Sequence, residues 1–114
     1  MNQWAITLNE YQVAATRTAK YPNVGDNFTY PALGLAGEAG EVANKVKKVL
    51  RDRGGVLTDA DRVAIKAEIG DCLWYCAALA NELNSPLSDI ANENLDKLNG
   101  RLARGTISGD GDNR

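Results

Sequence analysis

Two stretches govern the architecture of this chain: LGLAGEAGEVANKVKKVL at residues 33–50 and VAIKAEIGDCLWYCAALANEL at residues 63–83. In both, apolar residues recur at the three- and four-residue spacing of an amphipathic helix. Each stretch also carries two acidic residues three positions apart, Glu38 with Glu41 and Glu68 with Asp71. Residues at this spacing share one helix face. If the two helices pack side by side in opposite directions, four carboxylates converge.

Two further helices are expected around this pair, at residues 7–20 and 86–103. Thr7 is the expected N-cap of the first, because Glu10 follows it at the spacing of a capping box. Ser85 is the expected N-cap of the last helix, with a proline at the first helical position. No strand pattern is convincing. We therefore expect an all-α bundle of four to five helices, forming a single domain over residues 1–114 with a flexible polar tail from about residue 105.

Composition excludes several classes of protein. The chain carries 13 basic and 15 acidic residues, a net charge of −2, which argues against nucleic-acid binding through a basic field. No apolar run approaches the ~20 residues that a membrane-spanning helix needs. The N-terminus also lacks the pattern of a signal peptide. We expect a cytoplasmic protein that binds neither nucleic acid nor membrane.

Carboxylates, lysine, tyrosine or water must supply any acid–base or metal chemistry, because the chain contains no histidine and its two cysteines are interpreted as core residues. Acidic side chains beside an apolar stripe repel one another unless a cation neutralises them. Ligation by oxygen alone favours Mg²⁺, with Mn²⁺ as a substitute. Glu38, Glu41, Glu68 and Asp71 are therefore the candidate metal ligands and catalytic residues. The alternative is a solvated acidic face paired with lysines such as Lys45.

The last helix supplies candidate phosphate-binding groups. Asn94, Lys97 and Arg101 share one face of it, where lysine offers a point charge and arginine a fork of donors. A solvated polar face is the alternative interpretation.

Aromatic residues are candidate contacts for a nucleobase. Trp74 and Tyr75 follow the second acidic pair, and Phe28 and Tyr30 lie in the polar loop before the first pair. The alternative for the two loop aromatics is packing onto the core.

Three glycines occur within seven residues of the first stretch: Gly34, Gly37 and Gly40. Each costs about 0.5–1 kcal/mol in a helix interior relative to alanine. Their density indicates that a partner helix or a ligand approaches the backbone closely.

The acidic pairs stand in a recognisable order, Glu-x-x-Glu in GLAGEAGEVAN and Glu-x-x-Asp in AEIGDCLWY, followed by NENLDKLNGR. In this order and spacing the chain resembles the MazG-like nucleotide pyrophosphohydrolases, an all-α superfamily of NTP pyrophosphatases. The closing RGTISGDGDNR resembles the tails of small phage-type members, whose setting would be the host cytoplasm. The resemblance covers nearly the whole chain.

The resemblance implies a Mg²⁺-dependent enzyme that hydrolyses nucleoside or deoxynucleoside triphosphates to the monophosphate and pyrophosphate. It also implies a homodimer or homotetramer in which helices from more than one protomer line the site. Two alternatives remain open: a phosphoribosyl-ATP pyrophosphatase, and a non-catalytic helical module that binds a nucleotide or a partner.

Overall fold

The computed structural model describes residues 6–109 and 111, which are mainly helical. The elements are α1 (Leu8–Ala15), η1 (Thr16–Thr18, a 3₁₀ turn), α2 (Thr29–Arg53), α3 (Asp59–Glu82) and α4 (Leu87–Arg104). No strand occurs in this part of the chain, so the predicted all-α class is confirmed. The predicted polar tail lies partly outside the described residues.

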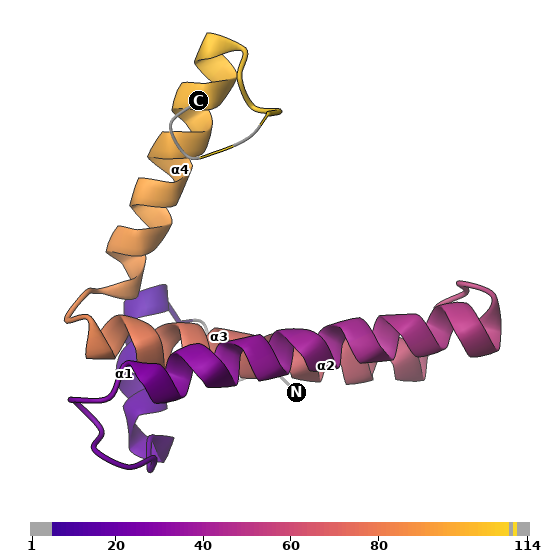
Figure 1. The fold of residues 1–114 in the computed structure, drawn as a ribbon, viewed down its shortest axis with the longest axis horizontal. Coiled ribbons are helices and arrows are strands. Elements are labelled where there is room, and N and C mark those ends of the chain that lie inside the picture. Colours follow the sequence, from indigo (N-terminus) through magenta and orange to yellow (C-terminus); the bar gives the residue numbers. More distant parts are fainter. Residues whose placement is uncertain (1–5, 110, 112–114) are drawn as a thin grey trace.

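α2 and α3 form a long antiparallel hairpin, the most extensive helix pair of the molecule (Figure 1). α2 ends at Gly54, whose φ of 60° is a left-handed conformation that glycine adopts without strain. α3 begins at the capping box of Thr58 and Asp61. The guanidinium of Arg53 donates two hydrogen bonds to the Asp61 carboxylate, which ties the two helix ends together.

α1 is shorter than expected. The capping box of Thr7 and Glu10 is present, but the α-helix ends at Ala15 and the chain tightens into η1. The hydroxyl group of Thr16 explains why the α-helix ends here, because its Oγ1 donates to the Val13 carbonyl at 2.6 Å. Such local side-chain bonds compete with a regular helix.

The junction between α3 and α4 depends on a buried glutamine. Gln12 of α1 is 6% exposed, and its Nε2 donates to Asn81 Oδ1 and to the Ser85 carbonyl at 2.9 and 2.8 Å. Its Oε1 accepts from the Leu87 amide at 2.7 Å. The predicted N-cap at Ser85 is wrong, because the N-cap residue is Pro86. The first backbone amide of α4, that of Leu87, donates instead to the side chain of Gln12 on α1.

The main cluster of buried apolar residues is small and lies where α1 meets α3 and the start of α4. Ala77, Ala80 and Leu87 form it, with Tyr11 and Ala15 packed against them. Along the rest of the hairpin large apolar side chains remain exposed, among them Leu33, Leu50, Val63, Ile69 and Leu73. One chain therefore leaves much of its apolar surface uncovered.

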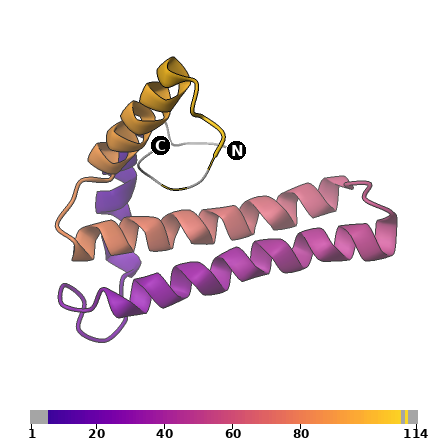
Figure 2. The same cartoon turned by 45° about the horizontal axis from the view of Figure 1, so that its top comes forward.

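α4 packs against α1 and stands away from the hairpin (Figure 2). The radius of gyration is accordingly 16.9 Å, whereas a compact domain of this length has about 13 Å. None of the described helices is both long and apolar enough to cross a membrane.

Candidate metal centre

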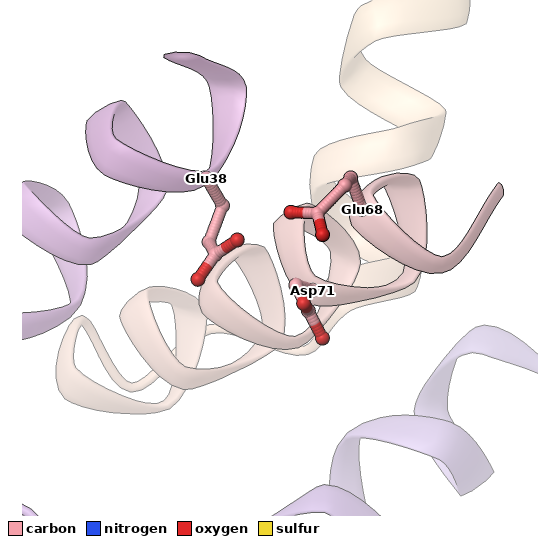
Figure 3. A group of neighbouring side chains, drawn as sticks. All are labelled: Glu38, Glu68 and Asp71. Atoms are coloured by element: carbon pink, nitrogen blue, oxygen red, sulfur yellow. The ribbon is translucent and has the colours of Figure 1, made fainter. Parts of the chain in front are cut away.

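Three of the four predicted carboxylates meet between the central parts of α2 and α3. One oxygen each from Glu38, Glu68 and Asp71 lie within 4.8 Å of one another. Figure 3 shows Glu38 reaching from α2 toward Glu68 on α3, with Asp71 one turn further along α3. The two acidic segments lie side by side in opposite directions, which is the condition under which the sequence analysis expected the carboxylates to converge.

Mutual repulsion marks this group of three, which we call the acidic cluster. Partial burial raises the pKa of Glu38 above its usual value, and a hydrogen bond to Glu68 and the charges of Asp71, Glu68 and Glu41 raise it further. No lysine or arginine among the described residues forms an ion pair with the cluster. The negative charge is thus left for another cation to neutralise.

The donor set fits a hard divalent cation. All donors are carboxylate oxygens, and their mutual spacing allows one ion to touch each residue. Mg²⁺ prefers oxygen ligands and retains several waters when few carboxylates bind it. Glu38, Glu68 and Asp71 are therefore the residues that could hold such an ion.

Glu41 lies outside the acidic cluster. It is exposed, as Asp71 is, whereas Glu38 and Glu68 are half-buried. Three residues turn an α-helix by about 300°, so Glu41 points about 60° away from Glu38 and toward solvent. Its role as a metal ligand stays a prediction.

The phosphate-binding residues expected on α4 are not next to the acidic cluster within one chain, because α4 contacts α1 and leaves the hairpin. Asn94 and Lys97 are exposed on α4. Arg101 is only 4% exposed, and its Nη2 donates to the Gly111 carbonyl at 3.3 Å. Arg101 is thus covered by the tail, and the alternative of a solvated side chain is wrong for it.

Gly34 explains part of the glycine pattern. A Cβ on Gly34 would lie 2.2 Å from Cε1 of Tyr75, so the phenol ring of α3 rests directly on the α2 backbone. For Gly37 and Gly40 no described atom lies within 4 Å of such a Cβ. The predicted close approach is therefore confirmed at Gly34 and absent at the other two within this chain.

Tyr75 lies between the acidic cluster and a group of aromatic rings. Burial raises the pKa of Tyr75, with further contributions from Tyr30 and from the charges of Glu38 and Asp71. The ring of Trp74 meets Tyr75 edge to face, at a centroid distance of 5.0 Å. An aromatic surface thus begins one helical turn from the carboxylates.

A cavity of about 350 Å³ opens at this aromatic surface. We call it the aromatic cavity; it is lined by Thr18, Lys20, Tyr21, Pro22, Tyr30, Trp74 and Tyr75. Tyr30, Trp74 and Tyr75 were predicted from the sequence as base contacts, whereas the lining residues from the segment 18–22 were not. No spacing signal connects that segment to α3, because only the tertiary fold brings it there.

The helices that carry the acidic cluster match the model of a known protein family. The model of the MazG nucleotide pyrophosphohydrolase domain matches residues 28–104, about two thirds of the chain. The chain belongs to the MazG nucleotide pyrophosphohydrolase family. The MazG match spans all of α2, α3 and α4 and includes all four predicted carboxylates, whereas α1 and residues 16–27 precede it.

A relative of this MazG protein occurs in a bacteriophage. The Gene 37 protein of Mycobacterium phage L5 is 52% identical over 109 residues, which cover 91% of this chain and 96% of the relative. No solved structure matches the chain significantly.

Proposed function

We propose that this protein hydrolyses nucleoside or deoxynucleoside triphosphates to the monophosphate and pyrophosphate, with Mg²⁺ as cofactor. The observation that carries the proposal is the convergence of Glu38, Glu68 and Asp71 from two helices of a MazG domain. Three carboxylates this close, without a basic partner in the described chain, form a site suited to a cation and, through it, to polyphosphate.

The acidic cluster of Glu38, Glu68 and Asp71 would hold the metal ion. A Mg²⁺ ion held there would supply positive charge that stabilises the negative charge developing on a leaving pyrophosphate. Mn²⁺ offers similar oxygen coordination and is the expected substitute.

A carboxylate of this site accepts the proton of the attacking water. The chain has no histidine, and a glutamate is the residue type that we propose for this role. Glu41 is suited to it, because it lies one helical turn from Glu38 but outside the group of three. Its exposed position also gives it access to water.

We further propose a homodimer or homotetramer in which α4 of one copy completes the site of another. Apolar side chains exposed along α2 and α3 provide surface for such packing. Asn94 and Lys97 on the projecting α4 would then meet phosphate oxygens across the interface, while Arg101 would first have to leave the tail. The phage relative is in keeping with action in a host cytoplasm.

A substrate panel tests the activity. We expect purified protein to release pyrophosphate from NTPs or dNTPs with Mg²⁺ and not with EDTA. Glu41→Gln is expected to lower the turnover rate by about 10²-fold or more, which is typical of losing general-base catalysis. Glu93→Gln, on the exposed surface of α4, is the matched control and should leave the rate unchanged.

Product analysis separates this activity from its alternatives. Turnover of phosphoribosyl-ATP with none of the dNTPs would assign the other pyrophosphatase reaction. Tight binding of nucleotide without monophosphate or pyrophosphate among the products would show a non-catalytic module, and would contradict the proposal.

A further inference from the structure

We propose that the aromatic cavity binds the nucleobase of the substrate, and that Lys20 gives it a preference for bases with carbonyl oxygens on the exposed edge, such as guanine, over adenine. The inference rests on the proposed function, since it takes the ligand to be a nucleotide whose phosphates lie at the acidic cluster. It concerns residues that the MazG match does not reach, because Thr18, Lys20 and Tyr21 precede residue 28.

The walls of the cavity suit a flat aromatic ligand. Its volume of about 350 Å³ falls at the lower end of the range for small-molecule sites. The rings of Tyr21 and Tyr30 stack at a centroid distance of 4.9 Å and an angle of 10°. Trp74 and Tyr75 supply two more rings at right angles to each other. Stacking on such side chains is the usual way in which proteins hold an unpaired base.

Hydrogen bonds fix these walls in place before any ligand arrives. The indole Nε1 of Trp74 donates to Thr18 Oγ1 at 2.8 Å, which ties α3 to η1. The hydroxyl of Tyr21 donates to Glu82, whose carboxylate also accepts from the amides of Gly25 and Asn27 at 2.8 Å. A preformed cavity loses less conformational entropy on binding.

The cavity and the acidic cluster lie along the same helix. Trp74 and Tyr75 follow Asp71 by three and four residues, a rise of about 4.5–6 Å along α3. Tyr75 rests on Gly34, which precedes Glu38 by one turn of α2. A nucleotide whose phosphates reach the carboxylates therefore has its base directed to these rings.

Lys20 gives the cavity its chemical preference. Its ammonium group has three donors and no acceptor. Guanine offers two adjacent acceptors, O6 and N7, whereas adenine places an amino donor beside N7. The two purines have the same stacking area. A difference in their affinity for the cavity therefore measures the hydrogen bonds made at the edge of the base.

Fluorescence of Trp74 measures base binding without metal or turnover. The other tryptophan, Trp4, is first replaced by phenylalanine so that Trp74 alone reports. We expect dGMP in EDTA to quench this signal saturably and to bind about fivefold or more tightly than dAMP, as for a well-formed edge contact. Lys20→Met, at an exposed position, should remove the preference, so that the variant binds dGMP and dAMP with equal affinity.

Two aromatic variants provide a matched comparison. Tyr30→Ala should weaken binding of both nucleotides about fivefold or more, because it removes a stacking wall. Phe28→Ala should not, because Phe28 is 63% exposed and does not line the cavity. Circular dichroism identifies any variant that fails to fold, and Lys20→Met then carries the test.

The outcomes separate this inference from the proposed function. Absence of quenching by dGMP, or equal affinity for dGMP and dAMP, would overturn the inference even if the protein hydrolyses triphosphates. Asp71→Asn should abolish pyrophosphate release and still bind dGMP in EDTA. Preferential dGMP binding by a protein that hydrolyses nothing would retain the base site and refute the proposed activity.

Discussion

The absence of a side chain at Gly34 allows the ring of Tyr75 to pack beside the acidic cluster. Because Gly34 has no Cβ, the Tyr75 ring can cross from α3 onto the α2 backbone, one turn from Glu38 and one turn from Asp71. The contact fixes the spacing of the two helices beside the acidic cluster. An alanine here overlaps the ring and forces the helices or the ring apart.

We predict that Gly34→Ala lowers the free energy of unfolding by about 1–3 kcal/mol, the usual cost of overpacking. Gly37→Ala is the control, because its Cβ meets no described atom within this chain. It should instead raise stability by about 0.5–1 kcal/mol through helix propensity. Urea denaturation measures both variants. Equal losses at the two positions would contradict the packing argument.

Glu82 holds the loop between η1 and α2. Hydrogen bonds from Tyr21 and from the amides of Asn27 and Gly25 lower the pKa of Glu82 below its usual value of 4.5. Burial and the bond to this carboxylate in turn raise the pKa of Tyr21 to about 12. The ionised carboxylate is therefore the form that the folded protein prefers.

We predict a pH-dependent loss of stability for Glu82→Gln. A lowered folded pKa means that the carboxylate stabilises the fold above the unfolded value near 4.5, and that this contribution disappears as the pH falls through the folded pKa. The melting temperature of the variant should lie below that of the wild type at pH 7. The difference should shrink under acid conditions. A difference that stays constant from pH 7 to pH 3 would show that Glu82 acts by shape alone.

Among the elements, α1 is the smallest helix and yet joins the other parts. It packs against both α3 and α4, and Gln12 bonds to the end of one and the start of the other. Its sequence signals a helix start at Thr7, which the structure has. Nothing in the sequence signals that its glutamine replaces the cap that Ser85 was expected to provide.

We predict that Gln12→Leu destabilises the protein by about 2–4 kcal/mol. The change leaves the buried Leu87 amide and its neighbours without their partners, and each such group costs about 1–3 kcal/mol. Asn9→Ala is the control, because Asn9 bonds to Ser88 of α4 at the exposed surface and should cost less. Thermal unfolding followed by circular dichroism measures both. A larger loss for Asn9→Ala would place the essential joint at the surface.

At the scale of the whole molecule, one chain is an open structure with a small core. Large apolar side chains remain exposed along both helices of the hairpin and along α4, for example Ile69, Leu73 and Leu95. Surface of this kind, in patches of several hundred Å² or more, commonly marks an interface. The proposed oligomer would cover it.

We predict that light scattering gives a mass of two or four times 12.3 kDa. Ile69→Lys, in the middle of α3, should shift the protein toward the monomer because a charge buried without a partner is costly. Val56→Lys is the control, since Val56 is 68% exposed in the connection between the two helices. A monomeric wild-type protein would refute the proposed assembly.

The helical class, the hairpin and its acidic cluster follow from local information. Apolar spacing, the cap at Thr58 and the left-handed Gly54 act within a few residues, and two acidic pairs on consecutive helices need only antiparallel packing to meet. These features could therefore be predicted, along with the family. The exclusion of Glu41 depends on the rotation of α2 about its axis, which apolar spacing specifies only to within about a residue.

Long-range contacts fixed the rest. The direction of α4 depends on hydrogen bonds of Gln12 with Ser85 and Leu87, which are more than 70 residues away in the sequence. This direction carries Asn94 and Lys97 away from the carboxylates. The aromatic cavity likewise needs Thr18 to meet Trp74 across 56 residues. Such pairings produce no periodic pattern in the sequence, because their free energy comes from contacts that exist only once the helices have packed.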